Sequence, residues 1–269
     1  MTEPEVLVVA DAAAASALAG DRIGAALRGA FESRGRADWA TTGGSTPIGI
    51  YRHLAIPAHV NDVPWPNVHV WWGDDRFVPR DHALSNVKAF DDILLDVGGH
   101  QAGQALGSSA TAIPLAVANL HPFRTSEAIG EGWGAAGCAA ELERELRAAD
   151  LEIVDGWPVL DLILLGVGGD GHVLSVFPGS EAFESKAWAL AIPAPTHIEP
   201  HVERVTLNPA ILAVVREVLV VMHGADKAAI LGDIFGPEVD PSRWPAQLTR
   251  RAGATWILDE AAAAHLPPR

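Results

Sequence analysis

Residues 161–172 read DLILLGVGGDGH, and this stretch decides the fold class. Its first half is a run of large apolar residues without polar alternation, which is typical of a strand that is covered on both faces. A second such run occupies residues 217–222, and helical patterns alternate with strands along the chain. The alternation predicts an α/β fold: a doubly wound, mostly parallel sheet with helices on both faces.

The other elements are predicted from apolar spacing, caps and breakers. We expect strands at residues 6–10, 38–42, 68–72, 161–166, 187–193, 204–208, 217–222 and 254–258, and a short strand near Ile113 within the glycine-rich loops of residues 97–124. We expect helices at residues 12–32, 47–54, 125–149 (at least in its second half), 209–214 and 226–235, one from the N-cap Ser85 to Leu95, and one after the last strand. No repeat, linker or charge block marks a boundary, so residues 1–269 are expected to form a single domain.

The bulk composition disfavours several classes of protein. The formal net charge of −15 argues against nucleic acid or an anionic membrane as a partner. Cys138 is the only cysteine, so neither an intrachain disulfide nor a thiolate metal cluster can form. The N-terminus lacks the basic region of a signal peptide, and no apolar run reaches the ~18–20 residues of a membrane span. We therefore expect a soluble, cytoplasmic protein that is a monomer or a dimer.

Three glycines after the strand, Gly166, Gly168 and Gly171, match the dinucleotide-binding pattern G-x-G-x-x-G. That motif needs a helix of several turns and an acidic residue about 20 positions later. Here the breaker sequence FPGS follows at residues 177–180, and the next predicted strand ends in prolines. The sequence therefore disfavours a nicotinamide site.

The same glycines carry Asp170 and His172 past the end of a strand, where open α/β sheets bind ligands. Glycine lets the backbone turn sharply or approach a ligand closely. Histidine is a suitable general base or acid near neutral pH. From these residues alone, a histidine that only hydrogen-bonds a loop explains the pattern equally well.

A second glycine turn, TTGGSTP at residues 41–47, links a predicted strand to a predicted helix. Gly43 and Gly44 allow a tight turn, and Ser45 and Thr46 supply hydroxyl groups. The helix start adds free N–H groups and the positive end of the helix dipole, so the turn is suited to hold a phosphate. A capped helix start without any ligand is the alternative.

Charged residues also stand at the ends of other predicted elements. The sequence WWGDDRFVP places Asp74, Asp75 and Arg76 behind an apolar strand, where charges are costly to desolvate unless they are paired or used. These residues form a structural ion pair, or a carboxylate among them holds Arg76 toward an anionic or carbonyl oxygen of a ligand.

Arg204 and Lys227 begin a predicted strand and a predicted helix. Each alone reads as a surface charge, but with the glycine turn they are able to close a phosphate site.

Six blocks occur in order over about residues 40–262: GGSTP, VHVWWGDDRFVPRDHALSN, LLGVGGDGHVLSVFPGS, RVTLN, GADK and TWILDEAAA. In this combination the chain resembles the 6-phosphogluconolactonases. The resemblance implies the fold shared with glucosamine-6-phosphate deaminases and ribose-5-phosphate isomerases. It also implies hydrolysis of 6-phosphogluconolactone in the pentose phosphate pathway, without a metal or an organic cofactor.

By position in these blocks, the resemblance implies that His172 is the catalytic histidine and that Arg76 contacts the substrate. It further implies that the phosphate is surrounded by Gly44, Ser45, Thr46, Arg204 and Lys227. We add Gly43 of the glycine turn and Asp75, which is expected to contact Arg76, to the substrate-binding set.

Four positions depart from the family's usual residues. None of these departures removes a side chain that the resemblance assigns to catalysis or substrate binding. Asp75 stands where glutamate is usual, so its contact with Arg76 spans one methylene less. The other departures are Gly169, Leu174 and Asn208.

A lactone is a cyclic ester, so its hydrolysis needs an activated water and a stabilised oxyanion. We expect His172 to take a proton from water as that water attacks C1. Arg76 and loop N–H groups are expected to stabilise the oxyanion. Asp170 either orients the imidazole or only shapes the turn.

Two other functions compete with lactone hydrolysis. A sugar-phosphate deaminase or isomerase on the same fold is disfavoured by Arg76, because deaminases usually carry a D-E-Y type of block there. A non-catalytic sugar-phosphate-binding protein is disfavoured by the presence of His172.

Overall fold

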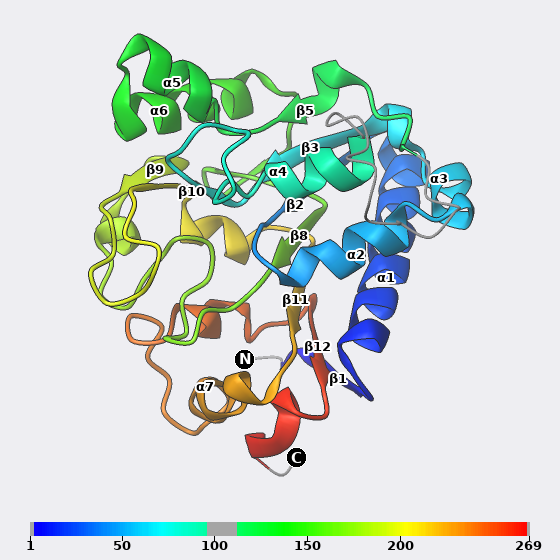
Figure 1. Ribbon diagram of the computed structural model, residues 1–269, viewed down its shortest axis with the longest axis vertical. Helices are drawn as coiled ribbons and strands as arrows, with labels where there is room; N and C mark the ends of the chain where they lie inside the picture. The colour runs from blue at the N-terminus through cyan, green and yellow to red at the C-terminus, as the bar shows by residue number, and fades with distance from the viewer. Residues whose placement is uncertain (1–2, 96–111, 268–269) are drawn as a thin grey trace.

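A parallel sheet forms the centre of the computed structural model, which describes residues 3–95 and 112–267 (Figure 1). Within these residues the sheet has seven strands in the order β1-β12-β11-β8-β2-β3-β5, and every neighbouring pair is parallel. The strands are β1 (Glu5–Val9), β2 (Ala37–Thr41), β3 (Val68–Trp72), β5 (Leu120–His121), β8 (Leu162–Leu165), β11 (Glu217–Met222) and β12 (Ala254–Asp259). The predicted α/β, doubly wound architecture is confirmed.

Helices and a smaller sheet surround these strands. The helices are α1 (Ala12–Arg34), α2 (Thr46–Leu54), α3 (Pro57–Asp62), α4 (Lys88–Phe90), α5 (Thr125–Glu131), α6 (Gly134–Ala148) and α7 (Ala228–Ile234). In Figure 1, α1, α2 and α3 lie together on the right of the central strands, and β9 and β10 lie on the left. None of the helices in the described part of the chain combines the length and apolarity that a membrane crossing needs.

Helix α1 shows how local sequence sets the ends and the buried face of an element. Asp11 is the N-cap and accepts a hydrogen bond of 2.8 Å from the backbone N–H of Ala14. Gly35 ends the helix with a φ of 74°, a left-handed conformation that glycine adopts without strain. Small and apolar residues three or four positions apart bury one face of the helix: Ala15, Ala19, Ile23, Leu27 and Ala30.

The smaller sheet contains two strands that the sequence predicts and one that it does not. Residues 187–193 and 204–208 contain the strands β9 (Ala189–Ile192) and β10 (Arg204–Leu207), as predicted. These strands do not join the central sheet, because they pair antiparallel with each other and with β4 (Asp74–Arg76). Strand β4 is absent from the prediction, since its sequence DDR carries no apolar signal. A further hairpin joins β6 (Ile153–Val154) and β7 (Trp157–Pro158).

Several helix predictions also need correction. The helix expected over residues 125–149 is divided into α5 and α6, because Gly132 and Gly134 adopt left-handed φ values of 73° and 67°. Ser85 is not a helix N-cap: α4 begins at Lys88, and the Ser85 hydroxyl donates to Asp75 instead.

Some predicted elements are shorter or lie elsewhere. The strand expected near Ile113 is misplaced, because Ile113 belongs to no strand and β5 begins at Leu120. The predicted loop residues 97–111 lie outside the described residues. The helices expected at residues 209–214 and after β12 are 3₁₀ segments, Pro209–Ala213 and Ala262–His265. A 3₁₀ turn, Ala225–Lys227, precedes α7.

The order of the strands creates a switch point between β2 and β8. From β2 the chain continues outward through β3 to β5, and it then returns to β8 and continues the other way through β11 and β12. Loops that follow the carboxyl ends of β2 and β8 therefore diverge and leave a crevice, which is where open α/β sheets bind ligands.

Candidate active site

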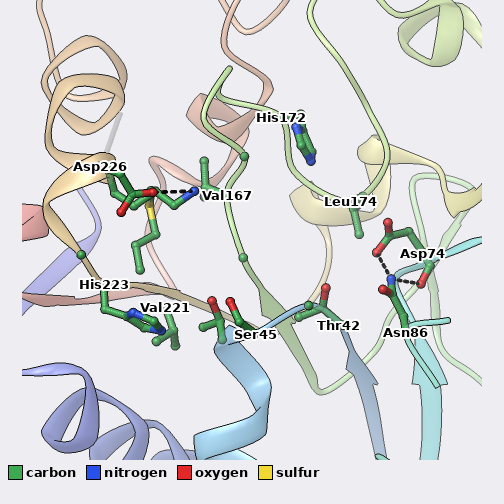
Figure 2. Close-up of a pocket in the computed structure, with 18 of the residues that line it drawn as sticks. Thr42, Ser45, Asp74, Asn86, Val167, His172, Leu174, Val221, His223 and Asp226 are labelled. Carbon is green, nitrogen blue, oxygen red and sulfur yellow. Dashed lines mark hydrogen bonds and ion pairs between the residues drawn. The ribbon is translucent and has the colours of Figure 1, made fainter. Parts of the chain in front are cut away.

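A cavity of about 430 Å³ lies at this switch point (Figure 2). The loops after β2, β3, β8 and β11 line it together with Asn86. Of the residues predicted from the sequence, the cavity is lined by Gly43, Gly44, Ser45, Thr46, Arg76, His172 and Lys227. The three other predicted residues, Asp75, Asp170 and Arg204, lie behind this lining and contact residues near it.

His172 and Asp170 form a hydrogen-bonded pair at one end of the cavity. The Nδ1 atom of His172 lies 2.5 Å from Oδ1 of Asp170, and the His172 backbone N–H donates to the same oxygen at 3.2 Å. Burial raises the pKa of Asp170, but the hydrogen bonds and charge of His172 and the hydrogen bond of His197 outweigh it and hold this pKa well below its usual range. An ionised Asp170 accepts a hydrogen bond from Nδ1–H of His172. The lone pair on Nε2 of His172 is then free to accept a proton.

His197 is part of this pair's surroundings, although no motif in the sequence identifies it. Its Nε2 atom lies 2.8 Å from Oδ2 of Asp170, so two imidazoles share one carboxylate. Phe177 packs against both rings, with centroid distances of 4.8 Å to His172 and 5.6 Å to His197. Only the three-dimensional approach of the loop before β10 brings His197 here.

Gly168 explains why a glycine precedes the pair. A Cβ atom at this position would overlap Nδ1 and Cε1 of His172 and would lie 2.7 Å from Oδ1 of Asp170. The backbone N–H of Gly168 also donates to the His172 carbonyl at 3.0 Å, which closes the turn. The glycine therefore provides the room in which the imidazole lies against its own loop.

Replacing Gly168 by alanine is expected to lower kcat by about 10²-fold, because the new methyl group displaces the His172 ring. Gly169→Ala is the matched control, since nothing lies within 4 Å of a Cβ atom at Gly169. Steady-state kinetics and thermal unfolding of both variants check the prediction. Equal activity of the two variants would contradict it.

The acidic residues after β3 have separate roles. Asp75 is fully buried and accepts hydrogen bonds from the backbone N–H groups of Arg76 and Asn86, both at 2.7 Å, and from the Ser85 hydroxyl at 3.1 Å. Burial raises the pKa of Asp75 to about 7, and the nearby Asp74 carboxylate adds to this effect. Asp75 thus fixes the Arg76 backbone, while the Arg76 guanidinium donates to the Leu84 carbonyl at 2.9 Å.

Asp74 connects the cavity wall to the loop after His172. Its carboxylate accepts 2.6 Å and 3.1 Å hydrogen bonds from the Ser175 hydroxyl and the Asn86 amide, the latter shown in Figure 2. A Cβ atom at Gly43 would overlap the Asn86 side chain, so Gly43 lets the glycine turn approach Asn86. Asn86 belongs to a block that the resemblance covers, yet that resemblance assigns it no role.

The other end of the cavity is suited to an anion. The glycine turn leads into α2 through Gly44, whose φ is 85°, and Ser45 makes no side-chain capping bond to the helix. The Ser45 hydroxyl and the N–H groups at the start of α2 are therefore available to a ligand. Lys227 faces the same cavity, with its Nζ atom 3.7 Å from Asp226.

His223 also lines this end, and no pattern in the sequence singles it out. Figure 2 shows its ring near Ser45, whereas His172 lies at the opposite end of the view. The backbone N–H of Gly224 donates to both carboxylate oxygens of Asp259, at 3.0 and 3.1 Å. That contact anchors the loop that carries His223 and Lys227.

Arg204 lies next to Arg76 in the smaller sheet. The two residues are register partners across the β10–β4 pair. Arg204 is buried and its Nη2 atom donates to the Pro200 carbonyl at 2.8 Å, while its Nη1 atom has no hydrogen-bond partner among the described residues. Burial and the neighbouring Arg76 lower the pKa of Arg204. Arg204 is therefore next to Arg76, which lines the same cavity as Lys227.

The fold and the site together define a class: doubly wound α/β proteins with a histidine–carboxylate pair and a helix start suited to an anion at the switch point. Residues 10–257 match the family model described as glucosamine-6-phosphate isomerases/6-phosphogluconolactonase. The chain therefore belongs to this family, in agreement with the resemblance.

Individual relatives agree with this assignment. A 6-phosphogluconolactonase of Synechocystis sp. is 33% identical over 240 residues, which cover 89% of this chain and 88% of that protein. One of Mycobacterium tuberculosis is 32% identical over 253 residues, with coverages of 93% and 94%. The solved structure of the Trypanosoma brucei 6-phosphogluconolactonase gives a TM-score of 0.81 at 25% identity and covers 99% of this chain and 100% of that one.

Proposed function

We propose that this chain is a carboxylic ester hydrolase that converts 6-phospho-D-glucono-1,5-lactone to 6-phospho-D-gluconate in the pentose phosphate pathway. Curated relatives that cover most of the chain bear the name 6-phosphogluconolactonase. One observation supports the chemistry most strongly: His172, which is paired with Asp170, lines the same cavity as Lys227 and the glycine turn. A base and an anion anchor in one site suit a phosphorylated ester.

In this proposal His172 is the general base and then the general acid. Its Nε2 atom takes a proton from water as the water oxygen bonds to C1 of the lactone. The carbonyl oxygen becomes an oxyanion, which Arg76 and loop N–H groups stabilise. The bond between C1 and the ring oxygen then breaks, and the Nε2 proton passes to that oxygen. Asp170 holds the imidazole through Nδ1 during both transfers.

The phosphate serves as the anchor that places C1 beside His172. Lys227, Ser45, Thr46 and the N–H groups at the start of α2 are proposed to hold it, with His223 as an additional neighbour. Binding energy from a group remote from C1 positions the ring for attack. Arg204 acts behind Arg76 in this scheme, because it lies in the β10–β4 pair.

A coupled assay tests the proposed activity. Glucose-6-phosphate dehydrogenase generates the lactone in place, and its decay is followed with and without this protein after the spontaneous rate is subtracted. Faster decay is expected. Unchanged decay together with binding of 6-phosphogluconate would instead identify a non-catalytic binding protein, and release of ammonia from glucosamine 6-phosphate would identify a deaminase.

Replacing Lys227 by alanine is expected to raise KM by about 10- to 100-fold with a smaller change in kcat, since a charge-assisted contact to the phosphate is lost. Hydrolysis of unphosphorylated glucono-1,5-lactone should be nearly unaffected by the change. Lys186→Ala, at an exposed position, serves as the control. A Lys227 variant with the KM of the parent protein would remove Lys227 from the phosphate site.

A further inference from the structure

A cluster of three side chains away from the cavity has the composition of a metal site. Asp21 of α1, His53 of α2 and His59 of α3 place one ligand atom each within 4.8 Å of the other two. The Nε2 atoms of His53 and His59 lie 2.9 and 3.0 Å from the same Asp21 oxygen, Oδ1. Figure 1 shows the three helices that carry them packed together beside the sheet.

Two glycines of α1 provide the space for the imidazoles. A Cβ atom at Gly20 would lie 2.6 Å from Cδ2 of His53, and one at Gly24 would lie 3.2 Å from Nδ1 of His59. A glycine inside a helix lowers its stability by roughly 0.5–1 kcal/mol relative to alanine. Helix α1 therefore carries two unfavourable residues, one turn apart, at the positions against which the two rings lie.

The imidazole rings of His53 and His59 are largely buried, and their Nε2 atoms point toward the same carboxylate. The side chains of His59 and His53 are 12% and 23% exposed, whereas that of Asp21 is 61% exposed. The Nδ1 atom of His59 is buried without a hydrogen-bond partner among the described residues, so Nε2 is the atom that this ring offers. Two preplaced imidazoles thus converge on a carboxylate that is open to solvent.

We propose that Asp21, His53 and His59 bind a divalent transition-metal ion of the zinc type. Zn²⁺ takes imidazole nitrogen and carboxylate oxygen at about 2.0–2.2 Å, and three protein ligands leave its fourth position to water. Ligand atoms around such an ion are roughly 3.3 Å apart, so the present spacing needs only a small opening. The ion would tie α1 to α2 and α3 and would stabilise this side of the fold.

The affinity expected for the ion depends on the hydrogen bonds that the two imidazoles exchange when it binds. Without the ion, both Nε2–H groups donate to Asp21. With the ion, each neutral ring carries its proton on Nδ1, and His59 then has a buried donor without an acceptor, which is unfavourable. We therefore expect a dissociation constant on the order of micromolar, weaker than that of closed structural zinc sites.

Zinc itself is the probe for the test. The full chain, stripped with a chelator and dialysed, is titrated with Zn²⁺ against a chromophoric chelator, and Co²⁺ spectra report the coordination directly. One ion per chain is expected to bind, and the thermal midpoint should rise with Zn²⁺. Asp21→Asn and His53→Gln should each weaken binding by at least about tenfold. His265→Gln, which removes an exposed imidazole elsewhere, should bind as the parent chain does.

Two results would overturn the proposal. One is the absence of saturable binding at one equivalent of Zn²⁺, and the other is equal binding by the His53→Gln, Asp21→Asn and parent chains. Lactone hydrolysis by these variants verifies that they fold, because the three side chains are not among the residues that line the cavity.

Discussion

Replacing His172 by alanine is expected to lower kcat by about 10³-fold while leaving the binding of 6-phosphogluconate nearly unchanged. The variant loses the group that accepts the water proton and returns it to the ring oxygen, a contribution of typically 10²–10⁴ in rate. The residues proposed to hold the phosphate lie at the other end of the cavity and remain in place. Initial rates after subtraction of spontaneous hydrolysis, with calorimetric binding of the product, measure the two effects separately.

Two further variants make this result specific. His172→Gln keeps a polar side chain of similar length that is able to hydrogen-bond Asp170, but it cannot transfer the proton, so it should be as inactive as the alanine variant. His265→Ala removes an exposed imidazole and should retain full activity. A His172→Ala protein that hydrolyses the lactone within a few-fold of the parent rate would exclude His172 as the base.

The central strands can be predicted from the sequence because their physical signal is local. Strand β8 reads LILL and β11 reads EVLVVM, and a strand covered on both faces needs such unbroken apolar runs. Parallel strands separated by helices then place their carboxyl ends at one edge. For that reason, the strand pattern alone is enough to expect that the loops carrying Ser45, Arg76, His172 and Lys227 meet.

The missing parts depend on contacts between distant residues. Strand β4 consists of three charged residues, and only its pairing with β10 makes it a strand. Ser85 has the residue type of a helix cap, yet its hydroxyl donates a hydrogen bond to Asp75, ten residues earlier. His197 reaches Asp170 across 27 positions, and no periodicity or spacing records that approach.

Arg204 is a residue whose neighbour in the fold the sequence does not predict. Charge and the family's pattern predict that Arg204 contacts the phosphate, and the structure adds that Arg204 is the register partner of Arg76. The sequence identifies the cations of the site, but the register between β4 and β10 decides which of them act together.

Asp170→Asn is the second change with a large expected effect, a fall in kcat of about 10²-fold or more. The carboxylate, whose pKa is held well below its usual range, accepts hydrogen bonds from both His172 and His197. An amide cannot accept both, and its NH₂ group facing His172 Nδ1 favours the tautomer that carries the proton on Nε2. That tautomer is unable to act as a base.

The Asp170 carboxylate also contributes to stability in a way that depends on pH. Because the lowered pKa of Asp170 means that its ionised form is stabilised in the fold, the contribution to stability is present above about pH 4 and is lost as the pH falls. The variant should lose this contribution at neutral pH, and thermal unfolding measured as a function of pH checks this.

Matched variants decide between the two roles. His197→Ala keeps the bond between Asp170 and His172 and should lose much less activity than Asp170→Asn. Asp155→Asn is the control, because Asp155 is exposed in the β6–β7 turn at a φ of 51°, a conformation that asparagine also adopts. If the Asp170→Asn protein kept kcat within a few-fold of the parent, Asp170 would only shape the turn. His172 would then act as a base without a carboxylate to orient it.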